Sequence, residues 1–215
     1  MKLEVSCTVP RAVHLRELPE TYRKMPILGR GATSVVLQDP DPNYVLLLTK
    51  DAIKSDWQTQ SWGLAIGEHV EEYTANAHRK LHLRDYPLYV IRLPKLYPLS
   101  RSERAHMRKW MHLITKELRN EIAMERLANH GMRKTTAAPM AAARVSKSLR
   151  TDERFAAFEH REKFAHMLEF LTNYNDWLID LHGANVMKNV EGELVICDPI
   201  ISASLYQDLF GREAW

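Results

Sequence analysis

Three oxygen-bearing side chains near the C-terminus have types and a spacing that suit chemistry on a phosphate. Asn185 follows Asp180 by five residues, and Asp198 lies thirteen residues further on. Transfer of a phosphoryl group from a nucleotide needs a carboxylate that orients the accepting hydroxyl, and oxygen ligands for Mg²⁺. The pattern therefore predicts Asp180 as the catalytic base, and Asn185 and Asp198 as the metal ligands.

The segment between these residues predicts how they meet. Val186-Met187 and Leu194–Cys197 are short apolar runs of β type, and Asn189–Glu193 between them has the composition of a turn. Two strands joined by this turn would bring both ends of the segment together.

A glycine-bearing segment in the first 50 residues is the candidate for phosphate binding. Gly29-Arg30-Gly31-Ala32-Thr33-Ser34 is followed by Val35-Val36 and then by a Pro- and Asp-rich turn. A Rossmann fingerprint requires a helix directly after the glycines, and a Walker loop requires Gly-Lys-Ser/Thr. Neither is present. A β-hairpin remains, whose backbone covers the phosphates, with Lys50 at the end of the next strand, Tyr44–Thr49, placed to reach them.

Helices are predicted around these segments. Residues 57–80 place Trp62, Ile66, Val70, Tyr73 and Ala77 at helical spacing. Ser100 and Glu103 form a capping-box pattern at the start of a long helix that ends before Gly131. A further helix is expected over 151–174. The basic stretch 127–150 between them is predicted to be a mobile loop. The long helix should bury Met107, Met111, Ile114, Leu118 and Ile122.

In this order, the features resemble the protein-kinase-like superfamily, and most closely the early serine/threonine protein kinases of lytic short-tailed coliphages. The resemblance rests on Gly29–Val36, on Lys50, and on the run from Asp180 to Met187 with Asp198-Pro199. It implies ATP and Mg²⁺ as cofactors. It also implies a nucleotide site that comprises Gly29, Arg30, Gly31, Ala32, Thr33, Ser34, Val36, Lys50 and Glu68.

The implied fold is α+β, compact and bilobal. A β-rich N-terminal lobe with one main helix would span 1–93, a hinge 94–99, and a reduced, mainly helical C-terminal lobe 100–215. The helix of the first lobe should supply the glutamate that pairs with Lys50. Glu68 is chosen for this role, with Glu72 one turn away as the alternative.

Several residues depart from the protein-kinase pattern. His182 stands where a lysine is usual, and aminoglycoside-type phosphotransferases share this histidine, so it is included among the catalytic residues. Pro199 follows Asp198 in place of the usual Phe. Only 17 residues follow Asp198, so a long activation loop is not expected.

Composition limits the other classes of protein to which the chain could belong. The 215 residues carry a net charge of +3, which does not predict a nucleic-acid-binding surface over the whole protein. No apolar run approaches the roughly 20 residues of a membrane span, and Cys7 and Cys197 provide no disulfide framework. A cytoplasmic protein is expected, in the host cell if it is encoded by a phage.

The function expected from these features is that of a phage-type host-takeover kinase, which transfers the γ-phosphate of ATP to Ser/Thr of host proteins. Its basic segment Arg126–Arg150 would contact an acidic host protein, with nucleic acid as the weaker alternative. A catalytically weak or inactive relative that binds and inhibits a host polymerase or defence factor is a second reading. A small-molecule phosphotransferase of the aminoglycoside type is a third, and transfer of AMP by the same residues is left open, as is the oligomeric state.

Overall fold

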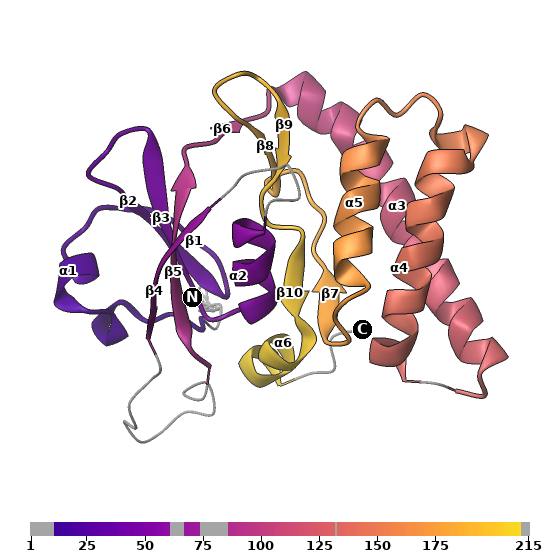
Figure 1. The fold of residues 1–215 in the computed structure, drawn as a ribbon, viewed down its shortest axis with the longest axis horizontal. Coiled ribbons are helices and arrows are strands. Elements are labelled where there is room, and N and C mark those ends of the chain that lie inside the picture. Colours follow the sequence, from indigo (N-terminus) through magenta and orange to yellow (C-terminus); the bar gives the residue numbers. More distant parts are fainter. Residues whose placement is uncertain (1–10, 61–66, 74–85, 132, 212–215) are drawn as a thin grey trace, which may run out of the picture.

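The N-terminal part of the α+β fold is a sheet of five antiparallel strands in the order β1-β2-β3-β5-β4 (Figure 1). The computed structural model describes residues 11–60, 67–73, 86–131 and 133–211. The predicted strand Tyr44–Thr49 is present. The strands are β1 (Ile27–Arg30), β2 (Ser34–Gln38), β3 (Tyr44–Thr49), β4 (Glu68–Tyr73) and β5 (Leu88–Pro94).

The glycine-bearing hairpin has the predicted form. Gly29 and Arg30 end β1, and Ser34 begins β2. The Gly31 N–H donates to the Ser34 carbonyl over 2.9 Å and closes the turn. Two short helices, η1 (Leu15–Glu17) and α1 (Glu20–Arg23), precede the hairpin. The buried residues of this region are Val13, Leu18, Tyr22, Val35, Leu37, Leu46, Leu48, Leu88 and Val90.

The helix predicted over 57–80 is wrong. Helix α2 spans Ala52–Thr59 and begins directly after β3, because the buried Asp51 caps its N-terminus. Residues 68–73 form the edge strand β4, which pairs with β5. Val70 and Tyr73 also fit a strand, and backbone pairing with β5 decides between the two patterns. Trp62, Ile66 and Ala77 lie outside the described residues.

The long helix of the C-terminal half is confirmed. Helix α3 spans Arg101–Ala128, and Ser100 and Glu103 form the predicted capping box. The Glu103 N–H donates to Ser100 Oγ over 3.3 Å, and the Ser100 N–H donates to Glu103 Oε2 over 2.9 Å. Gly131, beyond the helix end, has a φ of +87°. All five predicted core positions are buried: Met107, Met111, Ile114, Leu118 and Ile122.

The basic stretch 127–150 is a helix for most of its length, contrary to the expectation of a mobile loop. Helix α4 spans Lys134–Thr151 and lies against α3 and α5 (Arg161–Leu171) (Figure 1). Its small residues let the helices approach closely, and its arginines pair with acids of the neighbouring helices. Arg150 contacts Glu169 and Glu162, and Arg144 contacts Glu121 and Glu125. The buried small residues are Ala137, Ala138, Ala141 and Ala142.

Short elements complete the chain. The helix predicted over 151–174 is two pieces, η3 (Glu153–Phe155) and α5. One small sheet pairs β7 (Trp177–Ile179) with β10 (Ile200–Ser202), and another contains β6 (Tyr97–Pro98), β8 (Val186–Lys188) and β9 (Leu194–Ile196). Helix α6 (Ala203–Phe210) follows β10. In the described ranges, none of the helices combines the length and the apolar character that a bilayer crossing demands.

Candidate active site

The backbone holds Asp180 and Asp198 close together. Asp180 directly follows β7, and Asp198 lies two residues before β10, the strand that pairs with β7. The Asp180 N–H donates to the carbonyl of Pro199 over 2.7 Å, which continues the pairing of these strands. The two predicted acids therefore lie at the same end of one short ladder.

Asn185 links the backbone at Asp180 to the strand that precedes Asp198. Its side-chain Nδ2 donates to the Asp180 carbonyl over 2.6 Å. Its own carbonyl accepts from the Cys197 N–H over 2.9 Å, in line with the β8–β9 pairing. The predicted turn at Asn189–Glu193 connects these strands. Since Nδ2 is used by Asp180, the Oδ1 atom is the side of the amide that can accept or ligate.

The lysine that contacts Asp198 is Lys54. Its Nζ lies 2.8 Å from Asp198 Oδ1 and 3.0 Å from Oδ2. The prediction placed Lys50 at the phosphates. Lys50 is a buried residue that follows β3, and its backbone N–H donates to the Thr33 carbonyl over 3.2 Å. Lys54 lies one helical turn beyond Lys50, inside α2.

The charge of Lys54 is stabilised by its neighbours. Burial alone would lower the pKa of this ammonium. The charges of Asp198 and Asp51 raise it by more than burial lowers it, so the net shift of the pKa is upward. Lys54 therefore stays protonated although its side chain is only 5% exposed. A fixed cation beside a carboxylate is the arrangement that can neutralise a phosphate chain.

The turn of the glycine hairpin contacts the same cation. Lys54 Nζ donates to Thr33 Oγ1 over 2.9 Å. The Thr33 carbonyl also accepts from Thr49 Oγ1 over 3.1 Å. Thr33 and Ser34 are buried, whereas Arg30 and Gly31 are exposed. Of the predicted nucleotide residues, the structure brings Thr33 into direct contact with the Lys54–Asp198 pair.

Asp51 was not singled out by sequence reasoning. It is fully buried, and its Oδ1 accepts from the Lys54 N–H over 3.1 Å. Its Oδ2 accepts from the Ser202 N–H over 2.8 Å. Burial raises the pKa of this carboxyl. An Asp between a strand and the run Ala52-Ile53-Lys54 is an N-cap signal, and it marks the true start of α2.

Two further side chains fasten α2 to the strand before Asp198. Trp57 Nε1 donates to the Ile196 carbonyl over 3.0 Å, and Gln58 Nε2 donates to the Cys197 carbonyl. Cys197 precedes Asp198, and burial raises the pKa of its thiol to about 12. Helix α2 therefore positions Lys54 and the Asp198 backbone as one unit.

Glu68 does not lie on a helix, contrary to the prediction. It is an exposed residue of β4 and lies opposite Arg92 of β5. Strand β5 separates β4 from β3, which ends next to Lys50. Within the described residues, neither Glu68 nor Glu72 forms an ion pair.

His182 lies beside Asp180. Its Nε2 is 3.7 Å from Asp180 Oδ2, and its Nδ1 accepts from the Ala184 N–H over 3.2 Å. Because Nδ1 accepts, the neutral ring carries its proton on Nε2, facing Asp180. Burial and the charge of Asp198 raise the pKa of Asp180, whereas His182 and Lys54 act in the opposite direction.

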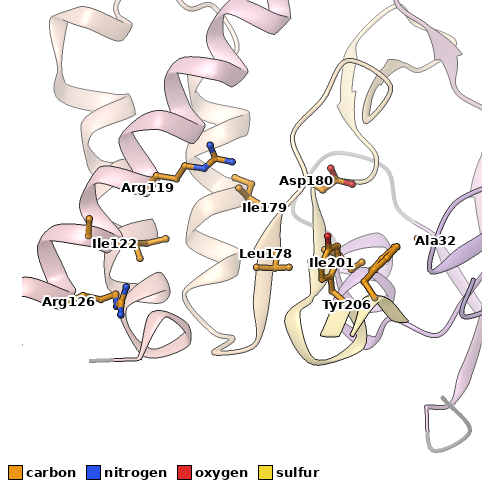
Figure 2. A pocket seen from close by; sticks show the side chains of 11 residues that line it. Ala32, Arg119, Ile122, Arg126, Leu178, Ile179, Asp180, Ile201 and Tyr206 are labelled. Carbon is orange, nitrogen blue, oxygen red and sulfur yellow. The ribbon is translucent and has the colours of Figure 1, made fainter. Parts of the chain in front are cut away.

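Asp180 also lines a cavity of about 780 Å³ between α3 and the glycine hairpin (Figure 2). Helix α3 forms one wall with two arginines, and β7, β10 and α6 contribute apolar side chains. The lining residues are Ala32, Arg119, Ile122, Ala123, Arg126, Leu178, Ile179, Asp180, Ile201, Tyr206 and Phe210. This volume lies within the range of small-molecule and cofactor sites.

Comparison with known proteins gives no match to a family model, to a curated protein or to a solved structure.

Proposed function

We propose that the protein is an ATP-dependent phosphotransferase of the protein-kinase type that phosphorylates Ser or Thr of other proteins. The observation that carries the proposal is the convergence of Asp180, Asn185, Asp198 and Lys54 beneath the turn of the glycine hairpin. A sheet with α2 on one side of residues 94–99, and a mainly helical part on the other, supports a bilobal arrangement (Figure 1).

Each residue has a defined part in this reaction. The Asp180 carboxylate takes the proton of the acceptor hydroxyl while the hydroxyl oxygen bonds to the γ-phosphorus. The bond between that phosphorus and the bridging oxygen breaks, and ADP leaves with its electron pair. The Lys54 ammonium lies where it can neutralise phosphate charge. His182 Nε2 lies 3.7 Å from Asp180 Oδ2, and its charge favours the ionised carboxylate.

A magnesium ion fits the residues that are present. Asn185 Oδ1 and the Asp198 carboxylate are hard oxygen donors, and Mg²⁺ in nucleotide sites uses one or two such protein ligands together with substrate phosphates. Within the described residues, no group of three or more His, Cys, Asp or Glu is arranged to hold a metal. When bound, the ion would supply charge neutralisation at the phosphates.

The resemblance to phage kinases supports host proteins as the acceptors. One observation favours a second candidate: His182 in the pattern Asp-x-His-x-x-Asn, beside a cavity of about 780 Å³, also suits a small-molecule phosphotransferase. A binding protein without transfer activity remains the alternative from a different class.

The test is incubation with Mg²⁺ and bacterial lysate, in parallel with γ- and α-labelled ATP. We expect label from γ-ATP on Ser or Thr of lysate proteins, and its loss in Asp180→Asn and Asp198→Asn. Glu191→Gln, an exposed carboxylate change in the β8–β9 turn, is the matched control and should keep full activity. Label from α-ATP would mean transfer of AMP. No label, with folded protein, would contradict the proposal.

A further inference from the structure

The wall of the Asp180 cavity formed by α3 carries two arginines on one face. Arg119 and Arg126 are seven residues apart, which is two helical turns, and both line the cavity. Figure 2 shows Arg119 extending from α3 in the direction of Asp180, with Arg126 further along the helix. Among the described lining residues, Asp180 is the one acid. The cavity is therefore positive along α3.

Two other basic residues of this region, Arg144 and Arg150, are paired with acids. Arg144 contacts Glu125, which is buried, and Arg150 contacts Glu169. Because these two charges are satisfied within the helical part, Arg144 and Arg150 contribute less to a docking surface than their composition indicates. Arg119 is different, because it is exposed and forms no ion pair within the described part of the chain.

Apolar side chains line the cavity together with the arginines and Asp180. Leu178 of β7, Ile201 of β10 and Tyr206 of α6 line the cavity opposite α3. A ligand for this surface needs apolar groups in its middle and negative charge on the side of α3. A polypeptide segment with acidic side chains meets both requirements.

We infer that this cavity, called here the acceptor cavity, binds an acidic segment of the protein substrate, with Arg119 and Arg126 pairing with its carboxylates. The inference rests on the proposed function, because it places the phosphorylated hydroxyl at Asp180. Seven helical residues span roughly 10 Å, and three residues of an extended peptide span about the same length. The preferred acceptors thus carry two acids about three residues apart, on one side of the Ser or Thr.

The first experiment measures binding without requiring catalysis. Fluorescence anisotropy would follow three labelled peptides with one serine and, at two positions three residues apart, Asp, Ala or Lys. We expect the Asp peptide to bind at least about tenfold more tightly than the Ala peptide. Arg119→Glu and Arg126→Glu should each remove most of this difference, and Arg119→Gln should weaken binding less. The double variant with both Arg119→Glu and Arg126→Glu should bind the Lys peptide more tightly than the Asp peptide.

A matched variant controls for general electrostatics. Arg108 is an exposed arginine of α3 that does not line the cavity, so Arg108→Glu changes net charge equally and should leave peptide binding unchanged. Equal binding of the three peptides, or an equal effect of Arg108→Glu, would overturn the inference. Tighter binding of a single-stranded oligonucleotide at the same arginines would also overturn it, since it would assign them to nucleic acid.

The second experiment separates the inference from the proposed function. With γ-labelled ATP, Arg119→Glu should raise KM for the Asp peptide about tenfold and leave kcat unchanged, because the arginine binds the acceptor away from the reacting atoms. Transfer to all three peptides with equal KM would contradict the acceptor preference, but it would still support the proposed kinase activity. Arginine-dependent binding without any transfer would contradict the proposed kinase activity, but it would still support the acidic-peptide surface.

Discussion

Lys54 Nζ lies 2.8 Å from Asp198 Oδ1, although the two residues are 144 positions apart in the chain. The ammonium also donates to Thr33 Oγ1 in the glycine hairpin. The Lys54 ammonium, which belongs to α2, therefore contacts both the turn of the glycine hairpin and the segment before β10. The stability and the activity of the candidate site should both depend on this contact.

Replacement of the two candidate lysines should separate their roles. Lys54→Met should lower γ-phosphate transfer by about 10²–10³-fold, because it removes the cation beside Asp198. It should also lower the free energy of unfolding by about 1–3 kcal/mol, since Asp198 and Thr33 lose their partner. Lys50→Met should change transfer by less than about tenfold. Initial rates and urea unfolding measure both effects, and equal losses of activity in the two variants would contradict the assignment.

Two glycines should respond differently to alanine. A Cβ at Gly67 would lie 2.5 Å from Leu93 Cδ2 and 2.8 Å from the Gln58 carbonyl, so Gly67→Ala should lower the free energy of unfolding by about 1–3 kcal/mol. At Gly29 the nearest atom is 4.0 Å away. Gly29→Ala should leave stability unchanged or raise it by up to about 1 kcal/mol.

The same Gly29→Ala variant tests the proposed nucleotide site. If the hairpin backbone covers the phosphates, the added methyl group should weaken ATP binding without affecting the fold. Thermal unfolding with and without ATP and Mg²⁺ would show this as a smaller shift in Tm than that of the unmodified protein. An unchanged shift would argue against phosphate contact at this position.

The capping box should make stability depend on pH in a defined window. Hydrogen bonds from Lys188 and from the Ser100 N–H lower the pKa of Glu103 from 4.5 to about 2. A depressed carboxyl pKa stabilises the folded state above the unfolded value, and this contribution is lost as pH falls through the folded one. The stability difference between the unmodified protein and Glu103→Gln should be full above pH 4.5 and disappear toward pH 2. Urea unfolding across this range measures it, with Glu191→Gln as the control.

The Cys197 thiol should be unreactive in the folded protein. Burial and the neighbouring charge of Asp198 raise its pKa to about 12, and only the thiolate attacks an alkylating agent. In a Cys7→Ser background, iodoacetamide at neutral pH should modify the folded protein at least about a hundredfold more slowly than the urea-unfolded chain. Similar rates in both states would show that Asp198 and its neighbours are open to solvent.

Local signals predicted part of the site well. The capping box of α3, the glycine hairpin and the β8–β9 turn are set by residues close in sequence, and all three are present. That turn brings Asn185 next to Cys197, and the pairing of β7 with β10 brings Asp180 next to Pro199.

Other parts depend on distant residues. The start of α2 depends on Asp51, whose second carboxylate oxygen binds Ser202, 151 residues away. The prediction places the helix later in the chain and names Lys50 at the phosphates, so it does not include Lys54. The helix α4 needs Glu125 and Glu169 from neighbouring helices to balance its arginines. No window of sequence contains those partners.

The pairing of β7 with β10 has a consequence for how the site tolerates change. The positions of Asp180 and Asp198 are set by peptide groups, such as the bond from the Asp180 N–H to the Pro199 carbonyl. The side chains on these strands are largely buried and do not set that spacing, whereas a slip by a single residue would turn one acid to the opposite face. The strand register therefore fixes the distance between the two acids, and substitutions that keep this register should keep that distance.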